Sequence, residues 1–188
     1  KRGFAFPLML ALGQPGEYLS ALPAALFIAL LLAVIWGAKE LYPKHNKLGL
    51  VVAALVILSA PIVIRSALYL NGHVLMALAV TVAVVVVISS VKKASLGPQQ
   101  LVVLMVALSV VSTTRAEGIA IAAVIALPLI ATRWITRSQI MLITTSATLS
   151  FGIWLAVYNS YILNSTGLPW PVFVLILVGL GLLAAIKP

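Results

Sequence analysis

The stretch Ser112-Thr113-Thr114-Arg115-Ala116-Glu117-Gly118 decides the fold, because it places a charged pair and a glycine between two short apolar runs. As helices, the runs Gln99–Thr114 and Ile119–Thr132 would extend about 24 Å and about 21 Å at roughly 1.5 Å per residue. The hydrocarbon core of a bilayer is about 30 Å thick, so neither run crosses it unless the turn between them lies below the headgroups. A charge that faces lipid at such a depth costs at least about 2.5–3.5 kcal/mol. We therefore predict that Arg115 and Glu117 are submerged and face protein or a wet cavity.

The composition predicts an all-α, polytopic membrane protein. Hydrophobic residues make up 63% of the chain and charged residues 8%, and the mean hydropathy is +1.22, which excludes a soluble monomer. The formal net charge of +9 comes from basic residues scattered between apolar segments, so nucleic acid is not an expected partner. The chain has no cysteine, two histidines are too few for a typical zinc site, and no cofactor-binding motif is identifiable.

Apolar segments separated by polar loops set the domain organisation. We expect residues 1–188 to form a single transmembrane domain, with a short interfacial segment at residues 1–16 and a transmembrane helix bundle at 17–188. The chain opens on Lys1 without a methionine, which we interpret as an internal fragment of a longer membrane protein. About seven segments are predicted, at Tyr18–Ala38, Leu48–Ile64, Val74–Val91, Gln99–Thr114, Ile119–Thr132, Gln139–Leu163 and Val172–Ile186.

The distribution of lysine and arginine predicts the orientation. Assigning alternate loops to one side collects most of the 12 basic residues there, and the positive-inside rule makes that side cytoplasmic. The N-terminus and the segments Arg65–His73, Arg115–Gly118 and Asn164–Trp170 are then extracytoplasmic. The cytoplasmic side carries Lys39, Lys44, Lys47, Lys92, Lys93, Arg133, Arg137 and Lys187, with the aromatic residues Trp36, Tyr42 and Trp134.

The same assignment brings four candidate substrate-binding residues to the extracytoplasmic side. Arg65, His73, Arg115 and Glu117 come from different segments and combine several cations with one carboxylate. Arginine binds phosphate through two parallel hydrogen bonds and does so most strongly where water is scarce. These residues therefore predict a site for an anionic ligand, without a metal.

Each candidate residue also has a structural interpretation. In the structural interpretation, Arg115 and Glu117 neutralise one another, or Glu117 pairs with Arg65. Either ion pair would only close a helical hairpin. Arg65 alternatively extends to the headgroups by snorkelling. His73 is either an acid or base or a hydrogen-bonded structural residue near a helix start. We expect the hydroxyls of residues 112–114 to hydrogen-bond to the backbone of their own helix.

Three segments of the chain carry a resemblance to a known family. These are Arg2–Leu10, Leu55–Leu78 with its Asn71-Gly72-His73-Val74-Leu75, and Thr114-Arg115-Ala116-Glu117-Gly118. In this order they resemble segments of the glycosyltransferase C superfamily, polytopic enzymes that transfer a sugar from a polyprenyl-phosphate carrier. The likeness is to the protein-mannosyltransferase and aminoarabinose-transferase-like branch. The third segment resembles the Arg-Pro-Glu-Gly signature that many members carry between two helices.

The resemblance implies an integral-membrane glycosyltransferase with an extracytoplasmic active site and a polyprenyl-phosphate-linked sugar as donor. It implies that Arg115 and Glu117 contribute to binding the donor phosphate, and that the catalytic carboxylate lies in a loop before Lys1. Gly72 and His73 stand where the family often carries a second acidic residue. These departures leave a non-catalytic subunit of a larger membrane complex, with partner subunits, as the alternative. A transporter is a third class, because transporters also use broken helices and buried charges, but no inverted repeat is evident.

Overall fold

The computed structural model describes residues 18–44, 72–114, 117–132 and 134–158, with residues 47, 50, 51, 54 and 55 between the first two ranges. Within these ranges the regular elements are α-helices and no β-strand occurs. The predicted all-α class is therefore confirmed for the described part of the chain. The helices are α2 (Tyr18–Leu41), α5 (Gly72–Lys93), α6 (Pro98–Thr114), α7 (Gly118–Ala131) and α8 (Arg137–Tyr158).

Three of the five helices are long and apolar enough to cross a membrane, at Leu22–Leu41, His73–Lys93 and Arg137–Leu155. This finding supports the predicted membrane protein. Helices α6 and α7 are apolar but shorter, as the two runs beside the Arg-Glu turn predicted. The described residues thus support three spans rather than seven. The predicted interfacial segment 1–16 and the segment Val172–Ile186 lie outside the described residues, as does most of Leu48–Ile64.

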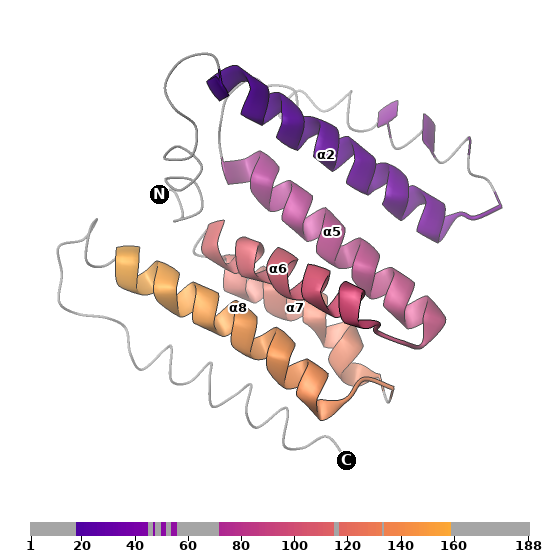
Figure 1. The fold of residues 1–188 in the computed structure, drawn as a ribbon. Helices are drawn as coiled ribbons and strands as arrows, with labels where there is room; N and C mark the ends of the chain where they lie inside the picture. The colour runs from indigo at the N-terminus through magenta and orange to yellow at the C-terminus, as the bar shows by residue number, and fades with distance from the viewer. Residues whose placement is uncertain are drawn as a thin grey trace.

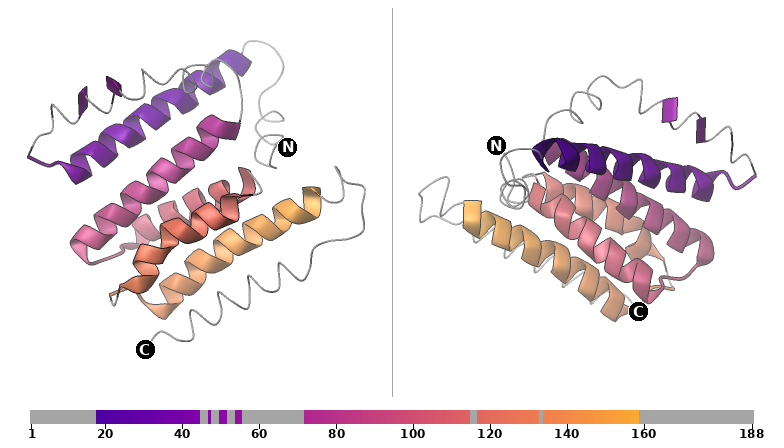
Figure 2. Two further views of the ribbon diagram at one scale, coloured as in Figure 1. Left: turned by 180° about the vertical axis from the view of Figure 1, so that it is seen from behind. Right: turned by 45° about the horizontal axis from the view of Figure 1, so that its top comes forward.

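The helices form a bundle in which α6 and α7 occupy the middle. Helices α2, α5, α6 and α8 follow one another side by side, and α7 lies behind α6, packed against α5, α6 and α8 (Figures 1 and 2). Because α6 and α7 are covered from several sides, they supply much of the core. Fully or nearly fully buried core residues include Ala83, Val86, Leu104, Leu108, Val111, Leu129 and Ile140.

Helix α5 ends in a Schellman motif formed without a glycine. The Ser95 amide donates to the Ser90 carbonyl at 3.1 Å, and the Ala94 amide donates to the Val91 carbonyl at 3.3 Å. This hydrogen-bond pattern needs a left-handed residue between them, and Ala94 has a φ of 47°. The chain then enters α6 at Pro98, a residue suited to the first turn of a helix because its missing amide would have no helical partner there.

Two glutamines connect the loops at this end of the bundle. The Gln139 side-chain oxygen accepts from the Thr136 amide at 3.0 Å, and the Thr136 hydroxyl accepts from the Gln139 amide at 3.3 Å, which is a capping box at the start of α8. The Gln139 side-chain nitrogen donates to the Leu96 carbonyl at 3.0 Å. Gln100 similarly accepts from the Gly97 amide at 3.1 Å. The start of α8 is therefore held level with the loop that precedes α6.

The basic residues of the described helices lie at this same end. The Lys92 ammonium donates to the Glu40 carbonyl, so the C-termini of α2 and α5 lie side by side. Lys39, Lys93 and Arg137 are exposed at the ends of α2 and α5 and at the start of α8. We call this end of the bundle the basic end (Figure 1). Arg133 and Lys187 lie outside the described residues, and the side of a membrane on which the basic end lies is not determined by the bundle itself.

Replacing Ala94 by glycine should stabilise the protein. The left-handed backbone at this position costs an L-residue roughly 1–2 kcal/mol, and glycine removes this cost. Part of the stabilisation is offset because glycine also gives the unfolded chain more conformational freedom. We expect a net stabilisation of about 0.5–1 kcal/mol in Ala94→Gly, measured by reversible unfolding in detergent micelles. The matched control is Ala77→Gly on the exposed face of the same helix, where glycine should destabilise by about 0.5–1 kcal/mol. Equal destabilisation in both variants would contradict the assigned motif.

Candidate functional site

The turn between α6 and α7 holds the charged pair that the sequence singles out. Helix α6 ends at Thr114, and Glu117 is the residue that precedes α7, with φ −78° and ψ −10°. Its side chain is exposed and makes no capping hydrogen bond to the helix. Its carbonyl accepts from the amides of Ala120 and Ile121 at 3.1 and 3.2 Å, which continues the helix. Arg115 lies outside the described residues.

Gly118 packs directly against the backbone of α6. A Cβ added to Gly118 would lie 1.9 Å from the carbonyl oxygen of Val111 and 2.8 Å from its carbonyl carbon. Both neighbours are backbone atoms, which cannot move aside as a flexible side chain can. The glycine of the Arg-x-Glu-Gly segment is therefore required by close approach of the two helices, which is independent of any ligand.

The last turn of α6 satisfies its own hydroxyl groups. The Ser112 and Thr113 hydroxyls each donate to the Ser109 carbonyl at 2.9 Å, and the Thr114 hydroxyl donates to the Val111 carbonyl at 2.9 Å. These bonds confirm the prediction made from the sequence. Since Ser112 and Thr114 are buried, the bonds allow polar side chains to sit at the centre of the bundle without unpaired hydrogen atoms.

The lengths of the helices place the turn below the far end of the bundle. Helix α6 has 17 residues and α8 has 22, which correspond to about 25 Å and about 33 Å. The bond from Gln139 to the Leu96 carbonyl makes the two helices start level at the basic end. Helix α6 therefore ends about 8 Å short of α8, close to the level of Trp154. The depth of the turn in a bilayer stays a prediction.

Only two of the four predicted site residues belong to the described part of the chain. His73 is exposed in the first turn of α5, and Glu117 is exposed before α7. Both stand at the end of the bundle opposite the basic end, on helices that pack against each other. Arg65 and Arg115 lie outside the described residues, so the predicted convergence of all four remains a prediction. Within the described ranges, no three His, Cys, Asp or Glu residues are grouped as metal ligands would be.

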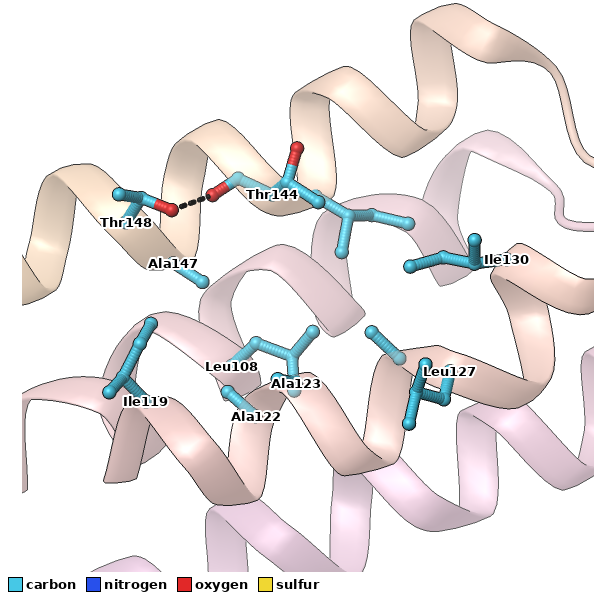
Figure 3. Close-up of a pocket in the computed structure, with 11 residues that line it drawn as sticks. Leu108, Ile119, Ala122, Ala123, Leu127, Ile130, Thr144, Ala147 and Thr148 are labelled. Atoms are coloured by element: carbon cyan, nitrogen blue, oxygen red, sulfur yellow. Dashed lines mark hydrogen bonds between the residues drawn. The ribbon is translucent and has the colours of Figure 1, made fainter. Parts of the chain in front are cut away.

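An apolar groove begins beside the turn and runs between α7 and α8. It has a volume of about 90 Å³ and is partly open (Figure 3). Ile119, two residues beyond Glu117, lies at one end of the groove, and Ile130 lies at the other. The floor includes Leu108 of α6. The remaining lining residues are Ala122, Ala123, Ala126, Leu127, Ile143, Thr144, Ala147 and Thr148.

The two threonines of the groove are engaged with their own helix. The Thr148 hydroxyl donates to the Thr144 carbonyl at 2.7 Å, and the Thr144 hydroxyl donates to the Ile140 carbonyl at 2.9 Å. The surface that remains for a ligand is therefore hydrocarbon. The sequence analysis did not find this groove. Its signal is the set of small residues at helical spacing on α7, namely Ala122, Ala123 and Ala126, which leave room against α8.

Comparisons with protein-family models, with curated proteins and with solved structures find no match to this chain.

Replacing Gly118 by alanine should disrupt the hairpin of α6 and α7. Because the added methyl group would overlap the Val111 carbonyl, we expect Gly118→Ala to lower the free energy of unfolding by more than about 2 kcal/mol. Gly97→Ala is the matched control, since its Cβ would meet only the Gln100 side-chain oxygen, at an ordinary 3.7 Å. Chemical unfolding in micelles measures both variants. An unchanged stability in Gly118→Ala would show that the two helices do not approach this closely.

Proposed function

We propose that this chain forms the lipid-carrier-binding core of an integral-membrane glycosyltransferase that uses a polyprenyl-phosphate-linked sugar. The proposal includes a polytopic bundle of about seven segments, with the basic end in the cytoplasm and the turn of α6 and α7 on the extracytoplasmic side. The observation that carries it is the position of the groove, which begins at Ile119, next to the turn that holds Arg115 and Glu117.

The groove suits the apolar part of such a ligand. A lipid-linked phosphate has a long hydrocarbon chain joined to a compact anion, so its site needs an apolar channel that opens beside cationic groups. The volume of about 90 Å³ is smaller than the roughly 150 Å³ of an engineered cavity that holds benzene. The groove would therefore take a short length of a narrow chain, and the rest of the chain would lie in the bilayer.

The turn suits the anionic part of the ligand. Helix α7 begins at Gly118, so its N-terminal amides and the positive end of its dipole face the turn. By resemblance, Arg115 would bind the phosphate through two hydrogen bonds, which a water-poor position strengthens. Glu117 would orient Arg115 or accept a hydrogen bond from a sugar hydroxyl.

A non-catalytic membrane subunit is the second candidate. His73 occupies the first turn of α5, at the position where the resembled family often carries an acidic residue. Within the described ranges, Glu117 is the single carboxylate at this end of the bundle. A chain of this kind would retain the lipid site and the fold, and would serve as a scaffold for partner subunits.

Filling the groove should weaken the binding of a polyprenyl phosphate. In Ala123→Phe the ring would occupy the channel, and we expect the dissociation constant of a long-chain polyprenyl phosphate to rise at least about tenfold. Ala120→Phe is the matched control, because Ala120 is equally exposed on α7 but does not line the groove. Equilibrium binding to the purified protein in nanodiscs measures both. Equal affinities in the two variants would contradict the groove as the chain site.

The same assay separates the two halves of the site. Arg115→Ala should reduce binding of the polyprenyl phosphate towards that of the matching polyprenol, which lacks the phosphate, while Arg115→Lys should retain part of the difference. If the unmodified protein binds the alcohol as tightly as the phosphate, the assigned phosphate site is wrong. Sugar transfer that is lost in Arg115→Ala supports the transferase. Lipid binding without transfer, together with stoichiometric co-purification of a partner, supports the subunit.

A further inference from the structure

Exposed cations gather at the basic end from neighbouring helices. Lys39 lies in the last turn of α2, Lys44 follows that helix, and Lys93 ends α5. Arg137 begins α8 and is also exposed. At this end, within the described residues, the single carboxylate is that of Glu40. These residues form a positively charged surface that extends across α2, α5 and α8.

The arrangement fits a plane of anions better than one small ion. Helices α2 and α5 end side by side, as the contact from Lys92 to the Glu40 carbonyl shows, and α8 starts level with the loop that follows α5. The cations therefore stand at a similar height but on separate helices. A compact anion would need them to converge on one point, whereas a layer of phosphate headgroups presents its charges over an area.

Aromatic residues mark the same level. Trp36 is 38% exposed near the end of α2, and Tyr42 is 59% exposed directly after it. Trp134, before α8, is half-buried. Tryptophan and tyrosine prefer the headgroup level of a membrane because their rings are apolar and their N–H or O–H groups are polar. Their position places the cations among the headgroups and not beyond them.

We propose that the basic end is a binding surface for anionic phospholipid headgroups, such as those of phosphatidylglycerol, and that Lys39, Lys44 and Lys93 select them over zwitterionic lipids. Lys92 adds a further positive charge beside Lys93, with its ammonium against the Glu40 carbonyl. The inference does not rest on the sugar-transfer function. It concerns the opposite end of the bundle and would hold equally for a scaffold subunit.

The test is the lipid preference of the protein in bilayers of phosphatidylcholine. Electron spin resonance of spin-labelled lipids measures how strongly each lipid associates with the protein surface. The quantity of interest is the ratio of the association constant of phosphatidylglycerol to that of phosphatidylcholine. The attraction between one lysine and an anionic membrane surface is about 1 kcal/mol, which corresponds to an about fivefold higher association constant for an anionic lipid. We expect a preference of about this size at low salt, falling as the ionic strength rises.

Substitutions localise the preference. The triple variant Lys39→Gln, Lys44→Gln, Lys93→Gln should lower the ratio most of the way towards one, while the triple Lys→Arg variant at the same positions should keep it. A ratio of one in the unmodified protein, or an unchanged preference in the triple glutamine variant, would overturn the proposal. Because the glutamine substitutions are at exposed positions, thermal unfolding should show that the variants remain folded.

Discussion

The contact between Gly118 and the backbone of Val111 is the constraint on which the arrangement of the bundle depends. Because the backbone at Gly118 touches the backbone at Val111 with no side chain between them, α7 starts directly beside the last turn of α6. Only residues 115–117 then remain to reverse the direction of the chain. Glu117 is thereby confined to the short connection between the two helices, and its level along the bundle follows from the length of α6. With a longer connection, neither the level of Glu117 nor the position of α7 beside the groove would be fixed by the length of α6.

The short hairpin also explains why a groove exists. Helix α8 is longer than α6 and α7 and extends past the turn, while α7 contributes three alanines to the middle of the groove, between Ile119 and Ile130 at its ends. The two helices therefore leave a partly open hydrocarbon channel that begins where the turn ends. Buried hydroxyls in α6 and α8 donate to carbonyls of their own helices, so they stabilise a central position without adding polarity to the channel. A polar turn and an apolar channel thus adjoin each other as a consequence of helix length and residue size.

The sequence predicted the helices better than the site. The short runs beside Arg115 and Glu117 gave the bounds of α6 and α7 to within a residue, because charged residues limit helices in apolar chains and Pro98 suits the first turn of α6. The spacing of lysines likewise predicted which helix ends lie together. The groove was missed because alanines at helical spacing are common in close packing, and only the placement of α8 shows that room is left. The close approach of Gly118 to Val111 was also not predicted, because it depends on how α7 packs against α6 and not on the local sequence.

The depth of residue 117 in a bilayer is the most direct test of the account. The chain has no cysteine, so Glu117→Cys and Ile153→Cys can each carry a single fluorophore. Ile153 is 50% exposed on α8, next to Trp154, whose level matches the turn. Quenching by lipids labelled at known depths should place both fluorophores at the same level, about 8 Å below the end of α8 and within the acyl chains. Strongest quenching of the residue 117 fluorophore by headgroup labels would place the turn at the membrane surface, and no quenching by any lipid would place it away from the acyl chains; either result would contradict the account.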